Sequence, residues 1–234
     1  MIGYYVHHHG QGHLARARCV AAAADEPVVA LSSLPEPAGH PFAGWVALPP
    51  DPFLPGADDP QANGALHWAP LDAPGYARRM AAIADWVTTV RPRVVVVDVS
   101  VEVAALVRLL GTRVVVVAGP GERSDDAHVL GGRMATQLVA PWPALGETST
   151  TVVHTGAFSR FDGRPVRPVP GDRRVLVLFG AGGDEVGTAR LDAAAAATPG
   201  WTWRRLGGSA GWVDDPWDEL QAADVVVTHA GLSA

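Results

Sequence analysis

The βαβ pattern is clearest in residues 2–31, which read IGYYVHHHGQGHLARARCVAAAADEPVVAL. The apolar run at residues 2–6 predicts a buried strand, and the Ala-rich stretch at residues 14–24 predicts a helix. A second apolar run at residues 28–31 predicts a strand parallel to the first, because the helix returns the chain to the same edge of a sheet. The histidines and glycines of residues 7–13 therefore fall in the loop between the first strand and the helix.

The same alternation continues through the first half of the chain. Residues 34–74 are too rich in proline and glycine for regular structure, and a loop of that length is functional by default. Residues 76–90 have helical spacing, and the valine run that follows predicts a strand ending at Asp98. A helix over residues 101–110 and a strand over residues 113–118 complete this part of the pattern.

The composition shifts at residues 159–171, which hold three prolines and no apolar periodicity. This stretch predicts a linker between two domains. Beyond it we expect a strand at 173–179, a Gly-rich turn at 180–187, a helix at 188–198 and strands at 201–206 and 224–228. The sequence thus predicts an α/β protein of two Rossmann-like parallel-sheet lobes, residues 1–158 and 172–234, with the second lobe incomplete.

Composition excludes several classes of protein. The 234 residues are 48% hydrophobic and 18% charged, which rules out a disordered chain. The net charge of −6 leaves no basic stripe for a nucleic acid, and the basic residues are all arginine, which excludes lysine Schiff-base chemistry. A single cysteine, Cys19, excludes a disulfide scaffold and is typical of a reducing cytoplasm. Neither a signal peptide nor a transmembrane segment stands out, so we expect a cytoplasmic protein.

The loop after the first strand allows three functional interpretations. Gly10, Gly12 and Ala15 match the dinucleotide-binding spacing, but the second strand is followed by serines and not by the acidic residue that a ribose needs. His7 and His9 alternate onto one side of an extended segment, yet the sequence shows no complete metal-ligand set, so no metal site is expected.

The third interpretation is an active-site loop with a general base. His13 lies in the first turn of the helix, where the helix dipole favours the neutral imidazole that accepts a proton. The alternative is that these histidines are polar loop residues without a catalytic role. This alternative stays open for His13 and is preferred for His7 and His8. His9 is intermediate between His13 and the other two.

Asp98 follows four valines, at the strand end that borders the ligand crevice of such sheets. It is a candidate to orient the imidazole of His13 and to stabilise its protonated form. The alternative is that Asp98 caps the helix that begins near Val101, for which Ser100 is also an N-cap candidate.

Two further turns carry candidate binding residues. Gly180, Gly182 and Gly183 lie between a strand and a helix, where backbone N–H groups can approach a ligand; a plain connector is the alternative. Residues 223–234 read ADVVVTHAGLSA, so a histidine follows a strand, and Gly231 and Ser233 would open the next helix. That histidine, His229, is a candidate donor to a leaving diphosphate.

Two polar segments lie outside these motifs. His67 and Trp68 belong to the Pro-rich region, and residues 125–128 belong to a stretch that we expect to be irregular. Both segments are candidates to line a substrate cleft, and solvent exposure explains them equally well.

The chain resembles glycosyltransferases of the GT-B fold, especially the family 28 type, which are related to the glucuronosyltransferases. The loop Gly10-Gln-Gly-His13, the linker after residues 155–160 and the segment ADVVVTHAG carry the resemblance. It implies an N-terminal lobe for an acceptor, either a small molecule or a lipid-linked one with peripheral membrane contact, and a C-terminal lobe for a nucleotide diphosphosugar such as a UDP-sugar. It implies no cofactor and no required metal.

The resemblance also implies roles for single residues. His13 would be the base that deprotonates the acceptor hydroxyl, supported by Asp98, with inversion at the anomeric carbon. His9, Gly10 and Gly12 would line the acceptor side. Gly180, Gly182 and Gly183 would lie in the cleft between the lobes, and His229, Gly231 and Ser233 would surround the donor diphosphate.

Two departures from the family pattern limit these expectations. The turn GAGG lacks the serine that is common in this family, and the acidic segment that grips the donor ribose is absent from the sequence. We therefore expect an enzyme truncated in its second lobe, and an assay of sugar transfer decides whether this truncation abolishes activity. The alternatives are a non-catalytic module that binds a glycan or lipid carrier, and a nucleotide-sugar epimerase, while a dehydrogenase is remote.

Overall fold

The computed structural model describes residues 1–9, 11–52, 55–119, 121–144, 151–180, 187–211 and 213–228. The chain forms two compact units. The first comprises Met1–His8 and Ala17–Phe158, and the second comprises His9–Arg16 and Ser159–Ala234. Within the described residues, no helix has the length and apolar character needed to cross a bilayer.

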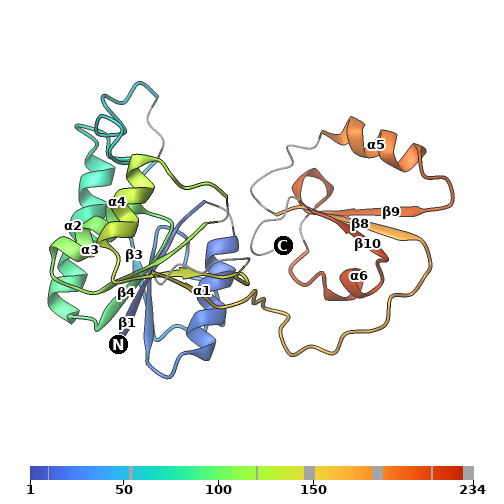
Figure 1. The fold of residues 1–234 in the computed structure, drawn as a ribbon, viewed down its shortest axis with the longest axis horizontal. Helices are drawn as coiled ribbons and strands as arrows, with labels where there is room; N and C mark the ends of the chain where they lie inside the picture. Colours follow the sequence, from blue (N-terminus) through green and yellow to red (C-terminus); the bar gives the residue numbers. More distant parts are fainter. Residues whose placement is uncertain are drawn as a thin grey trace. The chain divides into compact units, whose positions relative to one another are not determined.

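The first unit is built on a seven-stranded parallel sheet in the order β3-β2-β1-β4-β5-β6-β7 (Figure 1). The chain runs outward from β1 to β3 and then returns to β4 on the other side of β1, so the strand order reverses between β1 and β4. In doubly wound sheets, ligands bind beyond the carboxyl ends of the strands at such a reversal. The strands are β1 (Ile2–Val6), β2 (Val28–Ser32), β3 (Gly44–Ala47), β4 (Val94–Asp98), β5 (Val114–Val117), β6 (Gln137–Ala140) and β7 (Val152–His154).

Helices cover both faces of this sheet. Figure 1 shows α2 (Pro74–Val90), α3 (Val101–Leu109) and α4 (Asp126–Met134) on one face and α1 (Gly12–Ala23) on the other. A parallel sheet needs both faces covered, which explains why its strands are continuous apolar runs. The first turns of α1, up to Arg16, belong to the second unit, and the helix from Ala17 onward belongs to the first.

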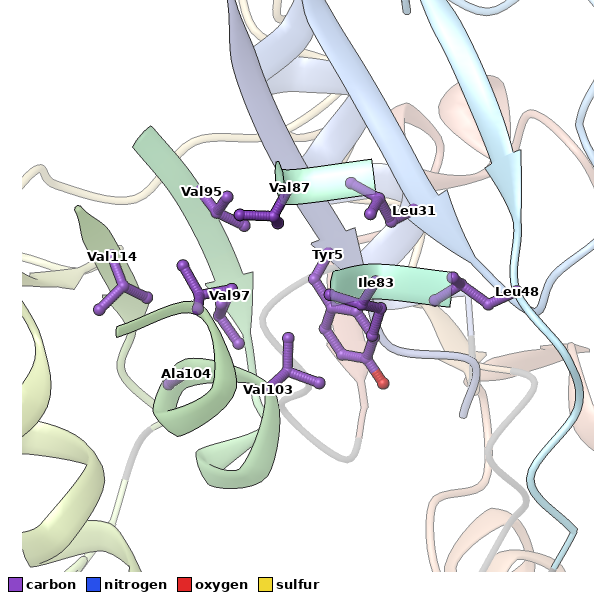
Figure 2. Close-up of a cluster of buried hydrophobic side chains, with 11 residues drawn as sticks. Tyr5, Leu31, Leu48, Ile83, Val87, Val95, Val97, Val103, Ala104 and Val114 are labelled. Carbon is purple, nitrogen blue, oxygen red and sulfur yellow. The ribbon is translucent and has the colours of Figure 1, made fainter. Parts of the chain in front are cut away.

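The main core lies between the sheet and α2 and α3. Figure 2 shows Tyr5, Val95 and Val97 from neighbouring strands packed with Ile83 of α2 and Val103 of α3. All five side chains are buried. Since side chains alternate along a strand, Tyr4, Val6 and Asp98 point to the opposite, α1-covered face. The helix predicted for residues 76–90 therefore packs on the sheet, through Ile83 and Val87.

Local signals in the sequence explain where two of these helices begin. Pro74 occupies the first position of α2, where its missing N–H costs nothing. Ser100 is the N-cap of α3, and its hydroxyl accepts a hydrogen bond from the Val103 N–H at 3.2 Å. The N-cap is thus Ser100 and not Asp98, so the alternative role for Asp98 as the cap is wrong.

The structure differs from the sequence prediction in two stretches of the first unit. The composition of residues 34–74 predicts no regular structure, but they contain β3, a short strand that pairs along β2. Residues 125–128 are predicted to be irregular, but they begin α4. Gly131 lowers the helix propensity of this segment, yet its lack of a Cβ lets α4 lie close to Val101 of α3.

The second unit has a three-stranded parallel sheet in the order β10-β8-β9. Val177, Phe179 and Leu191 form its small core. The edge strand β10 carries two exposed valines, Val225 and Val226. The strands are β8 (Arg174–Leu178), β9 (Thr202–Leu206) and β10 (Val225–Val227), and the α-helices are α5 (Thr188–Ala196) and α6 (Trp217–Gln221).

Asp224 and Gly207 determine the path of the chain next to the strands of this unit. The carboxylate of Asp224 accepts hydrogen bonds from the backbone N–H groups of Gly171 and Arg174, at 2.6 and 2.8 Å. The bond from Arg174 contributes most, and together the two bonds hold the pKa of Asp224 below its usual value. Gly207 follows β9 with φ of +78°, and a Cβ there would lie 1.8 Å from the carbonyl oxygen of Phe179. Only glycine allows this approach of the two strand ends.

Replacing Gly207 with alanine should destabilise the second unit. The new methyl group would displace the backbone at Phe179, and alanine would be strained at this positive φ, so we expect a loss of at least about 2 kcal/mol in urea denaturation. Gly187→Ala is the matched control, since a Cβ at Gly187 meets nothing within 4 Å. Equal stability of the two variants would contradict the close approach.

Candidate functional site

The candidate site lies at the carboxyl edge of the seven-stranded sheet. In the β1–β4 pair, Val6 is in register with Asp98, so the loops that follow these two strands leave the sheet side by side. The reversal of strand order falls at the same pair. This edge therefore collects polar side chains from loops that are distant in the sequence.

Asp98 is fully buried at the end of β4. The hydroxyl of Tyr4, on the neighbouring strand, lies 3.4 Å from Asp98 Oδ2 and can donate a hydrogen bond to it. A buried carboxylate is stable only when hydrogen-bonded or paired, and Tyr4 contributes to this. Asp98 thus lies at the carboxyl end of its strand, as its place after the valine run predicts.

The histidine-containing loop is divided between the units. His7 and His8 belong to the first unit and stack with a centroid separation of 4.9 Å. His9 and His13 belong to the second unit, with His13 in the first turn of α1.

Asp98 lies in the first unit, so the pairing of His13 with Asp98 stays a prediction. Gly12 is the first residue of α1, and Gly10 lies outside the described residues.

Arg79 forms a buried polar cluster under the loop after β1. Its guanidinium donates to the Tyr5 hydroxyl at 3.0 Å, to the Ser33 hydroxyl at 2.8 Å and to His8 Nδ1 at 3.3 Å. Because a guanidinium only donates, His8 Nδ1 must be the acceptor, which fixes the tautomer of this ring. Burial raises the pKa of Tyr5, and the nearby Arg79 opposes that rise.

A second polar cluster begins at Glu102, in the first turn of α3. One oxygen of this buried carboxylate accepts the backbone N–H groups of His67 and Trp68, at 2.7 and 3.0 Å, and the other accepts the Ser100 hydroxyl at 2.8 Å. Three hydrogen bonds satisfy the carboxylate without a cation. Glu102 therefore fixes the loop that carries His67 against the N-terminus of α3.

His67 meets the N-terminus of α4. Its Nε2 lies 3.1 Å from Asp125 Oδ1, and His128 Nδ1 lies 2.5 Å from Asp125 Oδ2. Asp125 also caps α4 by accepting the His128 N–H. The hydrogen bonds from the His128 ring and N–H, and then from His67, hold the pKa of Asp125 well below its usual range. Asp125 is thus a carboxylate held between two imidazoles.

The glycine-rich turn of the second unit follows β8, whose carboxyl end continues into Phe179 and Gly180. Gly180 is described there, whereas Gly182 and Gly183 lie outside the described residues. The same holds for His229, Gly231 and Ser233. The donor-side predictions for these five residues therefore remain predictions.

A pocket of about 630 Å³ lies at the opposite, amino edge of the first unit's sheet. Arg91, Arg93, Arg108 and Arg113 line it, from the last turn of α3 and the segments that join α2 to β4 and α3 to β5. This pocket is remote from the carboxyl ends of the strands, and we do not assign the candidate site to it.

The chain is similar to known proteins in its fold. No protein-family model matches the chain, and no curated protein matches it in sequence. Among solved structures, the spinosyn forosaminyltransferase SpnP aligns with a TM-score of 0.59 and 15% identity, over 98% of this chain and 74% of SpnP. The glycosyltransferase SsfS6 of Streptomyces sp. SF2575, solved with thymidine diphosphate, aligns with a TM-score of 0.55 and 15% identity, over 98% and 76% of the two chains.

MurG of Acinetobacter baumannii aligns with a TM-score of 0.51 and 14% identity, over 99% of this chain and 72% of MurG. Each of these alignments runs through both units of this chain. The chain has the GT-B fold. At such low identities the likeness establishes the fold of GT-B glycosyltransferases and carries no residue assignments.

The sequence does not predict the polar cluster around Arg79. The residue has no motif around it, and only its position on the sheet-facing side of α2, three and four residues before Ala82 and Ile83, marks it as buried. The contact between His67 and residues 125–128 is also not foreseeable, although the sequence marks both segments as polar candidates. They are 58 residues apart, and nothing local indicates that they meet.

Replacing Arg79 with methionine should lower the free energy of unfolding by about 2 kcal/mol. The change leaves the Ser33 hydroxyl and the Pro49 carbonyl without the guanidinium that now donates to them. The control is Arg78→Met, an exposed neighbour on the same helix, which should stay within about 0.5 kcal/mol of the parent. Urea denaturation measures both, and an unchanged or more stable Arg79→Met protein would show that burying the cation outweighs its hydrogen bonds.

Proposed function

We propose that the chain is an inverting glycosyltransferase that moves a sugar from a nucleotide diphosphosugar to an acceptor hydroxyl. The observation that carries this proposal is the GT-B fold, shared with several glycosyltransferases, one of them solved with thymidine diphosphate. The reversal of strand order beside Asp98 supports it, because ligand sites of parallel sheets form at such positions.

Residues 1–158 are proposed as the acceptor domain, 159–171 as the linker and 172–234 as the donor domain. His13 is the proposed base, because a neutral imidazole within reach of a hydroxyl can accept its proton. His9, Gly10 and Gly12 complete the acceptor loop in this proposal.

Asp98 is proposed to support that base. Its burial favours the role, since a carboxylate in a site of low dielectric interacts strongly with a nearby imidazolium. The hydrogen bond from Tyr4 limits the directions in which the carboxylate can turn. Neither observation requires that Asp98 itself take up the proton.

The reaction balances without an added reagent. The imidazole of His13 takes the acceptor proton while the acceptor oxygen bonds to the anomeric carbon. The bond between that carbon and the diphosphate oxygen breaks, and its electron pair leaves with the nucleoside diphosphate. Attack on the face opposite the leaving group inverts the configuration through an oxocarbenium-like transition state.

The donor side is proposed to use the glycine turn and the segment after β10. Gly180, Gly182 and Gly183 would bring backbone N–H groups toward the donor, and His229, Gly231 and Ser233 would surround the diphosphate. UDP-sugars are the proposed donors, with a small or lipid-linked acceptor. We place the protein in the cytoplasm, in peripheral contact with a membrane if the acceptor is lipid-linked.

The test uses the purified chain, a panel of nucleotide sugars and their nucleoside diphosphates. We expect one nucleoside diphosphate to raise the unfolding temperature, because a ligand that binds only the folded state stabilises it. With a matching acceptor, His13→Ala should lower the transfer rate by about 10²–10⁴-fold, the usual contribution of a general base, and leave diphosphate affinity unchanged.

His154→Ala is the control, since it removes an imidazole from β7 and should transfer sugar at the parental rate. Full activity of His13→Ala would show that another group is the base. A chain that binds no nucleoside diphosphate and transfers no sugar would overturn the proposed function itself.

A further inference from the structure

Three side chains with metal-binding atoms meet in the first unit, outside the residues proposed for sugar transfer. They are His67, Asp125 and His128, and one ligand atom from each lies within 4.8 Å of the other two. The Asp125 carboxylate lies between the two imidazoles, at 3.1 Å from His67 Nε2 and 2.5 Å from His128 Nδ1. The two rings have a centroid separation of 4.3 Å.

These separations are close to those of a metal site. Zn²⁺ bonds of about 2.0–2.2 Å in a tetrahedron place neighbouring ligand atoms about 3.4 Å apart. A cation could therefore replace the protons that now lie between Asp125 and the two rings after shifts of the side chains alone. The side chains are 40%, 52% and 25% exposed for His67, Asp125 and His128, so an ion can reach them from solvent.

The backbone around the three residues is fixed independently of any ion. Buried Glu102 accepts the N–H groups of His67 and Trp68 and so holds the His67 loop to α3. Asp125 is the N-cap of α4, and His128 lies in the first turn of that helix. Supporting hydrogen bonds of this kind orient ligands in metal sites and reduce the entropy lost on binding.

The ligand chemistry selects the class of ion. Two imidazole nitrogens and one carboxylate oxygen suit Zn²⁺ and its neighbours Co²⁺ and Ni²⁺, whereas Mg²⁺ and Ca²⁺ prefer oxygen alone. Three protein ligands also leave one position of a tetrahedron open.

We propose that His67, Asp125 and His128 bind one divalent transition-metal ion of the Zn²⁺ class. The fourth position takes a water molecule or another oxygen ligand. The sequence pattern shows no complete ligand set, because His67 is separated from Asp125 by 58 positions. The proposal does not depend on sugar transfer, since binding is measured without donor or acceptor.

The probes are Zn²⁺ and Co²⁺ added to the purified, chelator-treated chain. We expect one equivalent of Zn²⁺ in isothermal titration calorimetry and a higher unfolding temperature. We expect Co²⁺ to give the strong visible absorption of a four-coordinate ion, and Zn²⁺ to abolish it by competition. Coordination by the two imidazoles would also shift their ring resonances in NMR spectra.

Two variants remove single ligands with little effect on the fold. Asp125→Asn keeps a good N-cap but removes the charge, and His67→Ala removes an exposed ring while its backbone N–H stays on Glu102. Each should weaken Zn²⁺ binding by at least about tenfold. Glu36→Gln is the matched control, because Glu36 accepts from a single histidine, His40, and so offers only a two-residue site.

The outcomes distinguish a metal site from a cluster that only joins the His67 loop to α4 by hydrogen bonds. Loss of Zn²⁺ affinity in both ligand variants, with parental affinity in Glu36→Gln, supports the proposal. Absence of Zn²⁺ binding by the parent chain, or equal binding by Asp125→Asn and the parent, overturns it. Circular dichroism of each variant establishes that the fold is retained.

Discussion

Parallel pairing of β1 with β4 is the constraint on which the rest of the first unit depends. Both strands are covered on two faces, so their side chains must be apolar until the strands end. Polar chemistry is therefore confined to the positions at or just beyond Val6 and Asp98. The reversal of strand order at this pair leaves the two loops free of a crossing connection, and this freedom makes the edge suitable for a ligand.

Much of the fold follows from the sequence because its signals are local. The apolar runs that form β1, β4 and β8 are long and uninterrupted, and Ser100 marks the start of α3 with a side chain that caps it. The elements that sequence reasoning missed lack such signals. The strand β3 has only four residues and is defined by its pairing with β2, and α4 contains glycines that serve its packing.

The residues of the candidate site also differ in whether the sequence predicts them. A carboxylate at the end of a valine run is visible in the sequence, so Asp98 is recognisable from the amino-acid pattern alone. Arg79 and Glu102 are different, because a buried charge is recognisable only through the partners that satisfy it. Those partners are hydroxyls and backbone groups from other elements, namely Ser33, Tyr5 and the 67–68 loop. Long-range pairing of this kind leaves no periodicity in the sequence.

The strand β10 has a consequence for how the protein behaves in solution. Within the described residues it pairs on one side only, with β8, and Val225 and Val226 are exposed on it. The edge that the described residues leave unpaired carries apolar side chains, and such an edge is a template for a strand from another molecule. Self-association should therefore begin at this edge, grow with protein concentration, and be suppressed by a charged residue in place of either valine.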